Sequence, residues 1–405
     1  MKNIAFLSHP FHRGGVTGWM IEAAKEFNRI GYNVYFITVD PVLFLSGKLS
    51  YLLINLLDNS NISIISRKVS KVFELGLQSY REYTYASLVN KHIPQGIPIV
   101  LSDDKSVWGA GRLLSNRYPI IGVLHSDDSV YYNLYNSYCK YLSVTVTVSN
   151  RIRNNILKMH GANVNVIPCG INLPEFKHID KSRDLTLFWA GRIEEAQKRV
   201  SDIARIGKEL NNRGIDYHWI IAGHGEKNML KALIRGYEIE NKFEFKGWLN
   251  QREIYELMDM ADILVLTSNY EGMPVVVMEA LSKGLGIVST KVSGVEDLQL
   301  DKDAADIIKL YEIGNINDAV DNIISLKEEL NIEKRQKAST LARKYYSIET
   351  CINSYERIIE PVNSESSNKK SQFYSFGTFI LYPISFLISY LRLIKYNITH
   401  SVKHK

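Results

Sequence analysis

Residues 271–284 read Glu-Gly-Met-Pro-Val-Val-Val-Met-Glu-Ala-Leu-Ser-Lys-Gly, and they follow a short apolar run that predicts a buried strand. Pro274 is expected near the first position of a helix, where its missing N–H costs nothing. A strand, a short loop and an exposed helix N-terminus form a binding site for an anionic phosphate. The free N–H groups and the positive end of the helix dipole both lie at this N-terminus. Two carboxylates, Glu271 and Glu279, flank this phosphate site. Ionised carboxylates only accept hydrogen bonds, so they can bind the hydroxyl groups of a sugar, which donate them.

The block resembles the signature of the retaining glycosyltransferases of family 4 (glycosyl transferases group 1), in which two glutamates lie eight positions apart. The resemblance covers roughly residues 1–360 and is strongest over 185–290. It implies an α/β GT-B fold, with two Rossmann-like doubly wound domains facing a cleft. It also implies that Glu279 holds the ribose hydroxyls, that Glu271 approaches the transferred sugar, and that the adjoining Gly272, Met273 and Pro274 help to bind the donor. The alternative is an ordinary acidic turn before an amphipathic helix.

The rest of the chain supports two α/β domains, because apolar runs alternate with helical stretches as in parallel, doubly wound sheets. Strands are predicted at residues 4–8, 34–39, 62–65, 97–101, 120–124, 144–148, 185–190, 217–222, 243–245, 263–267 and 287–289. The predicted domains are 1–170, completed by a helix at 347–360, and 171–346, followed by a linker and tail at 361–405. A cleft between two such domains is the expected binding site.

Composition excludes several classes of protein. With 45% hydrophobic and 23% charged residues, the 405-residue chain is neither disordered nor a polytopic membrane protein. Three scattered cysteines are too few for a disulfide framework or a zinc site, which predicts a reducing, cytoplasmic location, and no signal peptide is visible. The tail at 361–405 carries +5 of the net charge of +6, so a nucleic-acid partner is not expected.

Two cations follow the strand predicted at 185–190. Gly191, Arg192 and Lys198 match a Gly-Arg-x5-Lys pattern of the family. The planar guanidinium of Arg can donate two parallel hydrogen bonds to a phosphate, and the ammonium of Lys is a compact positive charge. Together they can bind a diphosphate. The resemblance makes them the groups that grip the donor pyrophosphate and stabilise its departure, with Arg199 as a substitute. The alternative is a pair of surface cations on a solvated helix.

Two further segments of the first domain, each following a predicted strand, face the expected cleft. Gly14 and Gly15 follow the first strand, where glycine lets a ligand approach the backbone, although a tight structural turn explains them nearly as well. His125 ends the strand at 120–124, and a polar residue there projects into the ligand crevice of a parallel sheet. The resemblance gives His125 a catalytic role, contacting the donor sugar or stabilising charge at the reacting centre. A loop histidine without function is the alternative.

The second domain also holds the candidates for nucleotide binding. Gly223 lies in a turn that resembles the one beneath the nucleotide, and Trp248 and Leu249 match the segment that cradles the base. Trp248 packed in the core is the alternative. Asp301-Lys302-Asp303 is a D-x-D sequence, but it follows no clear strand, and cations already fill the role of a metal. We therefore expect no metal and no cofactor, and a UDP-sugar ahead of a GDP-sugar.

The tail predicts contact with the inner face of the cell membrane. Residues 371–391 carry no charge over a length that could span a bilayer, but Pro383 and several serines interrupt them. Basic residues follow, and a span would place them outside, against the positive-inside bias. We therefore expect residues 371–405 to lie on the membrane, with cations on anionic lipid heads. The acceptor is then expected to be a lipid-linked glycan in bacterial surface polysaccharide assembly (capsule, O-antigen or exopolysaccharide).

The predicted reaction is sugar transfer with retained anomeric configuration. No side chain is clearly placed as a covalent nucleophile, so attack on the face of the leaving group in one ion-pair-like step is expected. The rival hypotheses are a nucleotide-sugar epimerase or phosphorylase on the same fold, and a catalytically dead, membrane-tethered protein that binds a glycan or a nucleotide. Intact Arg192, Lys198, Glu271 and Glu279 argue against a dead site.

Overall fold

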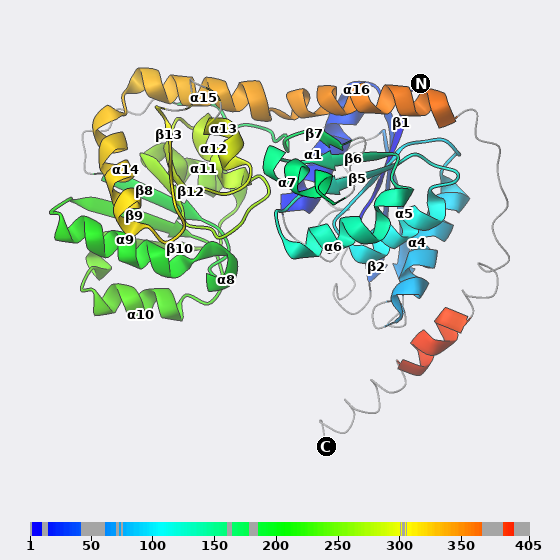
Figure 1. Ribbon diagram of the computed structural model, residues 1–405, viewed down its shortest axis with the longest axis horizontal. Coiled ribbons are helices and arrows are strands. Elements are labelled where there is room, and N and C mark those ends of the chain that lie inside the picture. The colour runs from blue at the N-terminus through cyan, green and yellow to red at the C-terminus, as the bar shows by residue number, and fades with distance from the viewer. Residues whose placement is uncertain are drawn as a thin grey trace.

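The computed structural model describes residues 2–9, 15–41, 61–69, 73, 76–159, 164–177, 185–299, 301, 304, 306–366 and 384–392. Two α/β domains lie side by side, each built on a parallel sheet (Figure 1). The predicted pair of parallel-sheet domains is therefore confirmed. Helices α15 and α16 run end to end along one side of both domains.

The first domain has a seven-stranded sheet in the order β3-β2-β1-β4-β5-β6-β7. The strands are β1 Asn3–Leu7, β2 Asn33–Pro41, β3 Ile62–Val69, β4 Ile99–Leu101, β5 Ile120–Leu124, β6 Val144–Thr147 and β7 Val164–Val166. The helices are α1 Gly15–Arg29, α4 Gln78–His92, α5 Lys105–Leu114, α6 Ser129–Tyr138 and α7 Asn150–Leu157. The strand order reverses at β1, so the carboxyl ends of β1 and β4 flank a topological switch point.

The second domain has a six-stranded sheet in the order β10-β9-β8-β11-β12-β13. The strands are β8 Leu185–Ala190, β9 Tyr217–Ala222, β10 Phe243–Gly247, β11 Ile263–Leu266, β12 Gly286–Thr290 and β13 Ile308–Tyr311. The helices are α8 Glu195–Lys198, α9 Val200–Asn212, α10 Asn228–Gly236, α11 Gln251–Met260, α12 Val275–Ser282, α13 Val295–Gln299, α14 Ile316–Glu329 and α15 Ile332–Tyr346. Every residue of β11 and β12 is buried, as expected of central parallel strands covered by helices on both faces.

The last long helix, α16 Ile348–Ser366, returns to the first domain as predicted. It packs against α1, and the Tyr355 ring lies 5.7 Å from the ring of Trp19. The helix was expected to end at residue 360, but it continues through Pro361 to Ser366. Proline removes one backbone hydrogen bond, and an exposed position in the last turns of a helix tolerates that loss.

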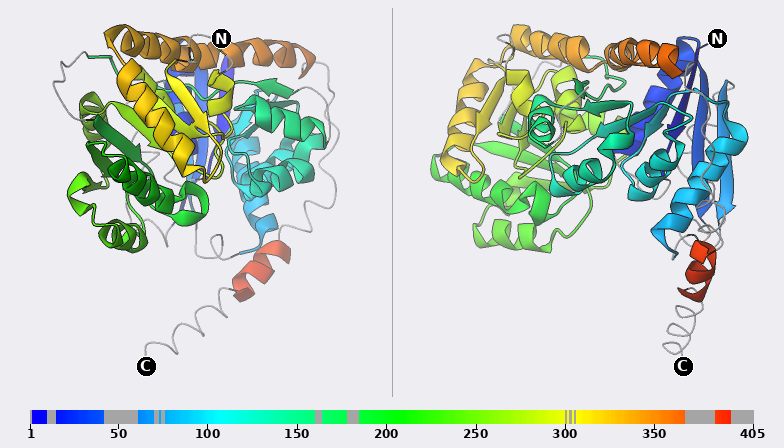
Figure 2. Two further views of the ribbon diagram at one scale, coloured as in Figure 1. Left: turned by 60° about the vertical axis from the view of Figure 1, so that its left-hand side comes forward. Right: turned by 45° about the vertical axis from the view of Figure 1, so that its right-hand side comes forward.

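A separate short helix covers residues 384–392 and lies beneath α4 (Figure 2). The neighbouring segments 367–383 and 393–405 lie outside the described residues, so most of the tail predicted to contact the membrane is not described. Within the described part of the chain, no helix combines the length and the apolar character that crossing a bilayer requires.

Candidate functional site

Arg192 and Lys198 lie in the connection between β8 and α9. The Arg192 side chain is 61% exposed, and its nearest partners are Gln197 Oε1 at 3.4 Å and Glu194 Oε1 at 3.7 Å. Contacts of this length and exposure hold the guanidinium weakly, so a ligand phosphate can replace them. Before it, the Gly191 N–H donates to Ala222 O at 3.0 Å, which ties this loop to the end of β9.

Lys198 points to the Glu-Gly-Met-Pro turn. Its Nζ lies 2.5 Å from Glu271 Oε1, and Ser268 Oγ donates to the same oxygen at 2.7 Å. The two partners are mostly buried. Arg199, the predicted substitute, adopts φ +45° and turns its side chain to the buried Asp202 rather than to the Glu-Gly-Met-Pro turn.

The Glu-Gly-Met-Pro turn touches the first domain directly. Gly272 forms an antiparallel bridge with Ser126, and the Asp127 N–H donates to Glu271 O at 3.2 Å. A Cβ atom on Gly272 would lie 1.8 Å from His125 O, so only glycine fits at this approach. His125 and Glu271, two of the four predicted catalytic residues, therefore lie on neighbouring backbone segments from opposite domains.

The remaining residues of the turn position helix α12. Met273 and Pro274 are buried, and Pro274 is the residue that caps α12 rather than its first helical residue. Across the junction, a Cβ atom on Gly15 would lie 3.9 Å from Val275 Cγ2, so the starts of α1 and α12 approach each other. Gly14, the other predicted glycine of this loop, lies outside the described residues.

His125 is buried at the end of β5. Its ring lies 5.0 Å from that of Trp19, and Nδ1 lies 3.6 Å from the thiol of Cys169. Burial lowers the pKa of His125 from 6.5 to about 3, so the ring is neutral at physiological pH. Its Nε2 has no hydrogen-bond partner among the described residues. A neutral imidazole with an unsatisfied nitrogen can exchange a hydrogen bond with a ligand, but it brings no positive charge to the site.

Glu279 lies on α12, away from solvent. Its Oε1 accepts hydrogen bonds from Gln251 Nε2 at 3.3 Å and from Tyr255 OH at 3.2 Å. Burial raises the pKa of the Glu279 carboxyl to about 7, although both hydrogen bonds oppose this shift. The sequence reasoning missed Gln251 and Tyr255. They lie four positions apart on α11, and residues with this spacing share one face of a helix. This spacing is the sequence signal that could have identified them as a pair.

Three loops at the carboxyl ends of β8, β9 and β10 pack closely through glycines. Gly223 adopts φ +149°, donates its N–H to Gly247 O at 2.7 Å, and leaves no room for a Cβ atom beside Gly191 O. Trp248 follows with 71% of its surface exposed, so the alternative of a core tryptophan is wrong. Leu249 is partly buried beside it. An exposed indole at the end of a parallel strand is available to stack on a planar ligand.

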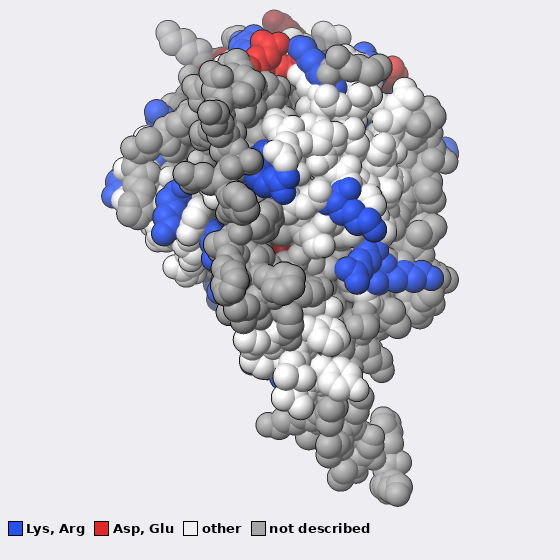
Figure 3. Space-filling model, turned by 90° about the vertical axis from the view of Figure 1, so that its right-hand side faces the viewer, with Lys and Arg blue, Asp and Glu red and all other residues white. Residues whose placement is uncertain are grey.

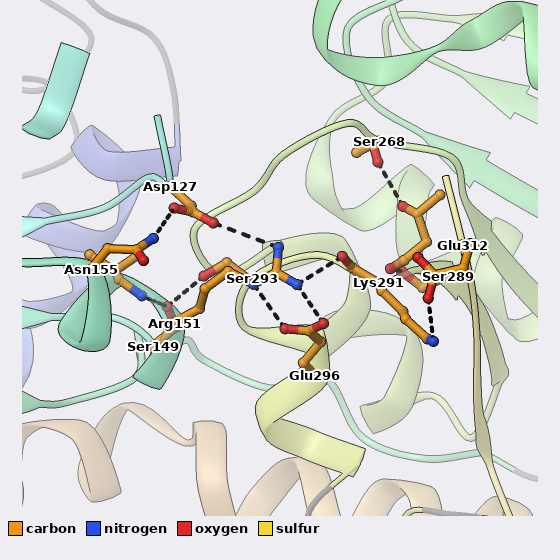
Figure 4. Close-up of polar contacts among 12 residues, drawn as sticks. Asp127, Ser149, Arg151, Asn155, Ser268, Ser289, Lys291, Ser293, Glu296 and Glu312 are labelled. Atoms are coloured by element: carbon orange, nitrogen blue, oxygen red, sulfur yellow. Dashed lines mark hydrogen bonds and ion pairs between the residues drawn. The ribbon is translucent and has the colours of Figure 1, made fainter. Parts of the chain in front are cut away.

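A polar network joins the two domains next to this site (Figure 4). Arg151 of α7 donates to Glu296 Oε2 at 2.9 Å and to Lys291 O at 3.0 Å. Ser149 and Ser293 share a hydrogen bond of 2.5 Å across the same junction. These contacts fix the first domain against the loop that follows β12.

The described residues contain no group of His, Cys, Asp or Glu side chains arranged to hold a metal ion. Of the D-x-D sequence, Asp301 accepts a hydrogen bond from Tyr345 and lies 3.4 Å from Lys344 Nζ. Lys302 and Asp303 lie outside the described residues. Asp301 therefore forms these polar contacts with α15 of the same domain.

Known proteins match both halves of the chain. The family model described as Glycosyl transferases group 1 matches residues 174–345, and the one described as Glycosyltransferase Family 4 matches residues 13–175. WcaL of Salmonella typhimurium, named for colanic acid biosynthesis, is 33% identical over 139 residues, which are 32% of this chain and 34% of that protein. The amylovoran biosynthesis glycosyltransferase AmsK of Erwinia amylovora is 34% identical over 96 residues, 22% of this chain and 24% of AmsK.

Each match therefore spans about a third or less of the curated relative. Among solved structures, Anabaena HepE in complex with UDP and glucose has the same fold, with a TM-score of 0.67 at 15% identity over 89% of this chain and 100% of that chain. Adjoining family models on the two domains and the shared two-domain architecture agree: the chain belongs to the group 1 glycosyltransferases with the GT-B fold.

Proposed function

We propose that the protein transfers a sugar from a nucleotide diphosphate sugar, with UDP ahead of GDP, to a lipid-linked glycan in bacterial surface polysaccharide assembly. The configuration at the anomeric carbon is retained, and no metal takes part. The observation that carries the proposal is the contact between Lys198 and Glu271, beside Arg192 and directly across the junction from His125.

The donor's diphosphate would lie between Arg192, Lys198 and the start of α12. The two cations and the free N–H groups of the helix neutralise negative charge as the diphosphate leaves. Glu271 and the backbone of Gly272 and Met273 would contact the transferred sugar, and Glu279 would accept hydrogen bonds from the ribose hydroxyls. Trp248 and Leu249 would lie against the base.

His125 would donate or accept one hydrogen bond to the sugar through its unpartnered Nε2. Because the ring is neutral, stabilisation of the departing diphosphate falls to the two cations and the helix dipole. No charged nucleophile is invoked on the opposite face of the sugar, so the acceptor would attack from the face that the diphosphate leaves. This geometry retains configuration in a single step, in which the proton of the acceptor hydroxyl passes to the departing phosphate oxygen.

The location that accompanies this proposal is the inner face of the cell membrane, where nucleotide sugars and lipid-linked acceptors meet. The names of WcaL and AmsK, colanic acid and amylovoran biosynthesis, support a polysaccharide product. HepE, solved with UDP and glucose, supports a uridine donor.

The proposal is tested by incubating the protein with a panel of UDP- and GDP-sugars and a lipid-linked acceptor extract. We expect free nucleoside diphosphate to be released with one donor, and NMR of the product to show the donor's anomeric configuration. Inverted product would contradict the retaining mechanism. Conversion of the donor without release of nucleoside diphosphate would favour an epimerase. Release of a sugar 1-phosphate from the glycan when inorganic phosphate is added would favour a phosphorylase.

A further inference from the structure

We propose that the face formed by β3, α4 and the helix at residues 384–392 docks on an anionic lipid bilayer. The apolar side of that helix would enter the headgroup region, and a basic groove between β3 and α4 would take lipid phosphates. Docking would bring the active site to a lipid-linked acceptor, so this proposal rests on the proposed function. Membrane binding itself is measured without donor or acceptor.

The helix at 384–392 has the opposite polarity to a surface helix of a soluble protein. Its serines face the protein: Ser389 Oγ accepts from the Leu77 N–H at 2.8 Å, and Ser385 shares a hydrogen bond of 2.9 Å with Ser79. Its large apolar residues are instead 41–57% exposed: Ile384, Phe386, Leu387, Ile388, Tyr390 and Leu391. Apolar side chains gathered on the outer side of a docked helix indicate a surface that is covered by an apolar medium.

The adjoining surface is basic. A groove of about 510 Å³ lies between β3 and α4, lined by Ser66, Arg67, Ser87, Leu88, Lys91 and His92. Among the described residues, Arg67, Lys68 and Lys91 form no ion pair, and the one acid of these two elements, Glu82, is buried against Arg112. Figure 3 views the molecule from this side and shows Lys and Arg spread over the face above the short helix, with acidic residues gathered at its upper edge.

Helix and groove belong to one continuous face. The helix docks on the start of α4 through Leu77 and Ser79, and the Phe386 ring lies 5.5 Å from that of Tyr80. Further along the same helix α4, Lys91 and His92 line the groove. Apolar side chains beside these cations complement a bilayer with anionic headgroups, which offers both an apolar interior and phosphates. A protein partner would have to supply both features, so we commit to the lipid surface.

The test is sedimentation of the full-length protein with vesicles of phosphatidylcholine containing phosphatidylglycerol, and with vesicles of phosphatidylcholine alone. We expect binding to the anionic vesicles that weakens as salt is raised. Leu387→Asp with Leu391→Asp should reduce binding at least about tenfold, because charged groups replace inserted apolar ones. Arg67→Gln with Lys91→Gln should remove most of the preference for anionic vesicles.

Matched control pairs carry comparable changes elsewhere on the surface: Met229→Asp with Met260→Asp, and Arg235→Gln with Arg252→Gln. Both should bind vesicles like the wild type. Melting temperatures of all variants, with and without UDP, show that they are folded and report donor binding separately from membrane binding. Unchanged binding of the Leu387/Leu391 variant, or no binding by the wild type, would overturn the proposal. A wild-type dimer that this variant converts to a monomer would show that a second copy covers the face instead.

Discussion

The ammonium group of Lys198 lies 2.5 Å from Oε1 of Glu271 and joins the end of α8 to the turn before α12. The cation proposed to bind the donor's diphosphate and the carboxylate proposed to face its sugar therefore hold each other in the free protein. Because each fixes the other's position, both are in place before the donor arrives, and little reorganisation is needed when charge develops.

Replacing Glu271 separates binding from transfer. In Glu271→Gln the ammonium of Lys198 is no longer neutralised, so we expect UDP to bind as tightly as to the wild type or more tightly. Transfer should fall by roughly 10²-fold, because the group that faces the sugar has lost its charge. Calorimetric titration with UDP and a turnover assay measure the two effects. Loss of UDP binding in this variant would show that Glu271 only supports the fold of the turn.

Ionisation of Glu279 is expected to make the affinity for the nucleotide depend on pH. Its pKa in the free protein is raised to about 7 by burial. In the proposed complex the ribose hydroxyls would donate hydrogen bonds to the ionised carboxylate. UDP affinity should therefore rise from about pH 6 to about pH 8, because a larger fraction of the Glu279 carboxyl groups is ionised at the higher pH. Titration calorimetry across this range measures the trend. Glu279→Gln should flatten it, and an equal slope in this variant would assign the dependence to another group.

The same carboxyl has an effect on stability without nucleotide. Between pH 4.5 and about 7 the folded state keeps a proton that the unfolded chain has released, so stability falls as pH rises through this window. The loss reaches at most about 3 kcal/mol above pH 7. Urea unfolding at the two ends of the window should show that Glu279→Gln gains stability relative to the wild type as pH rises.

Gly272 allows the two domains to touch. In Gly272→Ala the new Cβ atom would collide with His125 O, and the bridge to Ser126 would open. We expect a lower melting temperature and transfer reduced by at least about tenfold, because the sugar site is displaced. Gly236→Ala is the matched control, since a Cβ there meets nothing within 4 Å. It should leave activity unchanged, and an equal loss in both variants would exclude a special role for Gly272.

Arg151 holds the domain junction in place. Arg151→Ala removes hydrogen bonds to Glu296 and to the backbone of Lys291, and half-buried contacts of this kind contribute about 1 kcal/mol. We expect the free variant to have a larger radius of gyration in small-angle scattering. Arg213→Ala removes comparable contacts to Glu209 and Asp321 within the second domain. If both variants expand equally, the junction network is not what positions the domains.

The sequence predicted the second domain well because its central strands are buried on both faces. Continuous apolar runs such as Ile263–Leu266 are visible without an alignment, and Pro274 with the following helix is a local signal. For the same reason Glu271, Lys198 and Arg192 could be placed at strand ends, where parallel sheets present ligand-binding residues.

The elements that the sequence did not reveal lack such a pattern. Helix α4 buries polar residues such as Glu82 and Thr84, so its apolar periodicity is weak, and β7 is only three residues long. The contact of His125 with Gly272 and the domain network around Arg151 depend on how two domains meet. Local spacing carries no information about that relation. The left-handed backbone of Arg199, which turns its side chain to Asp202, has no sequence signal either.

The central claim is that Arg192 and Lys198 bind the donor's diphosphate. It is tested most directly by calorimetric titration of UDP and of uridine into the wild type, Lys198→Ala and the surface control Arg235→Ala. We expect UDP to lose about two orders of magnitude in affinity for Lys198→Ala, as charge-assisted phosphate contacts contribute about 1.5–3 kcal/mol each. Uridine should bind all three alike. Equal affinity of UDP for Lys198→Ala and the wild type would contradict the account.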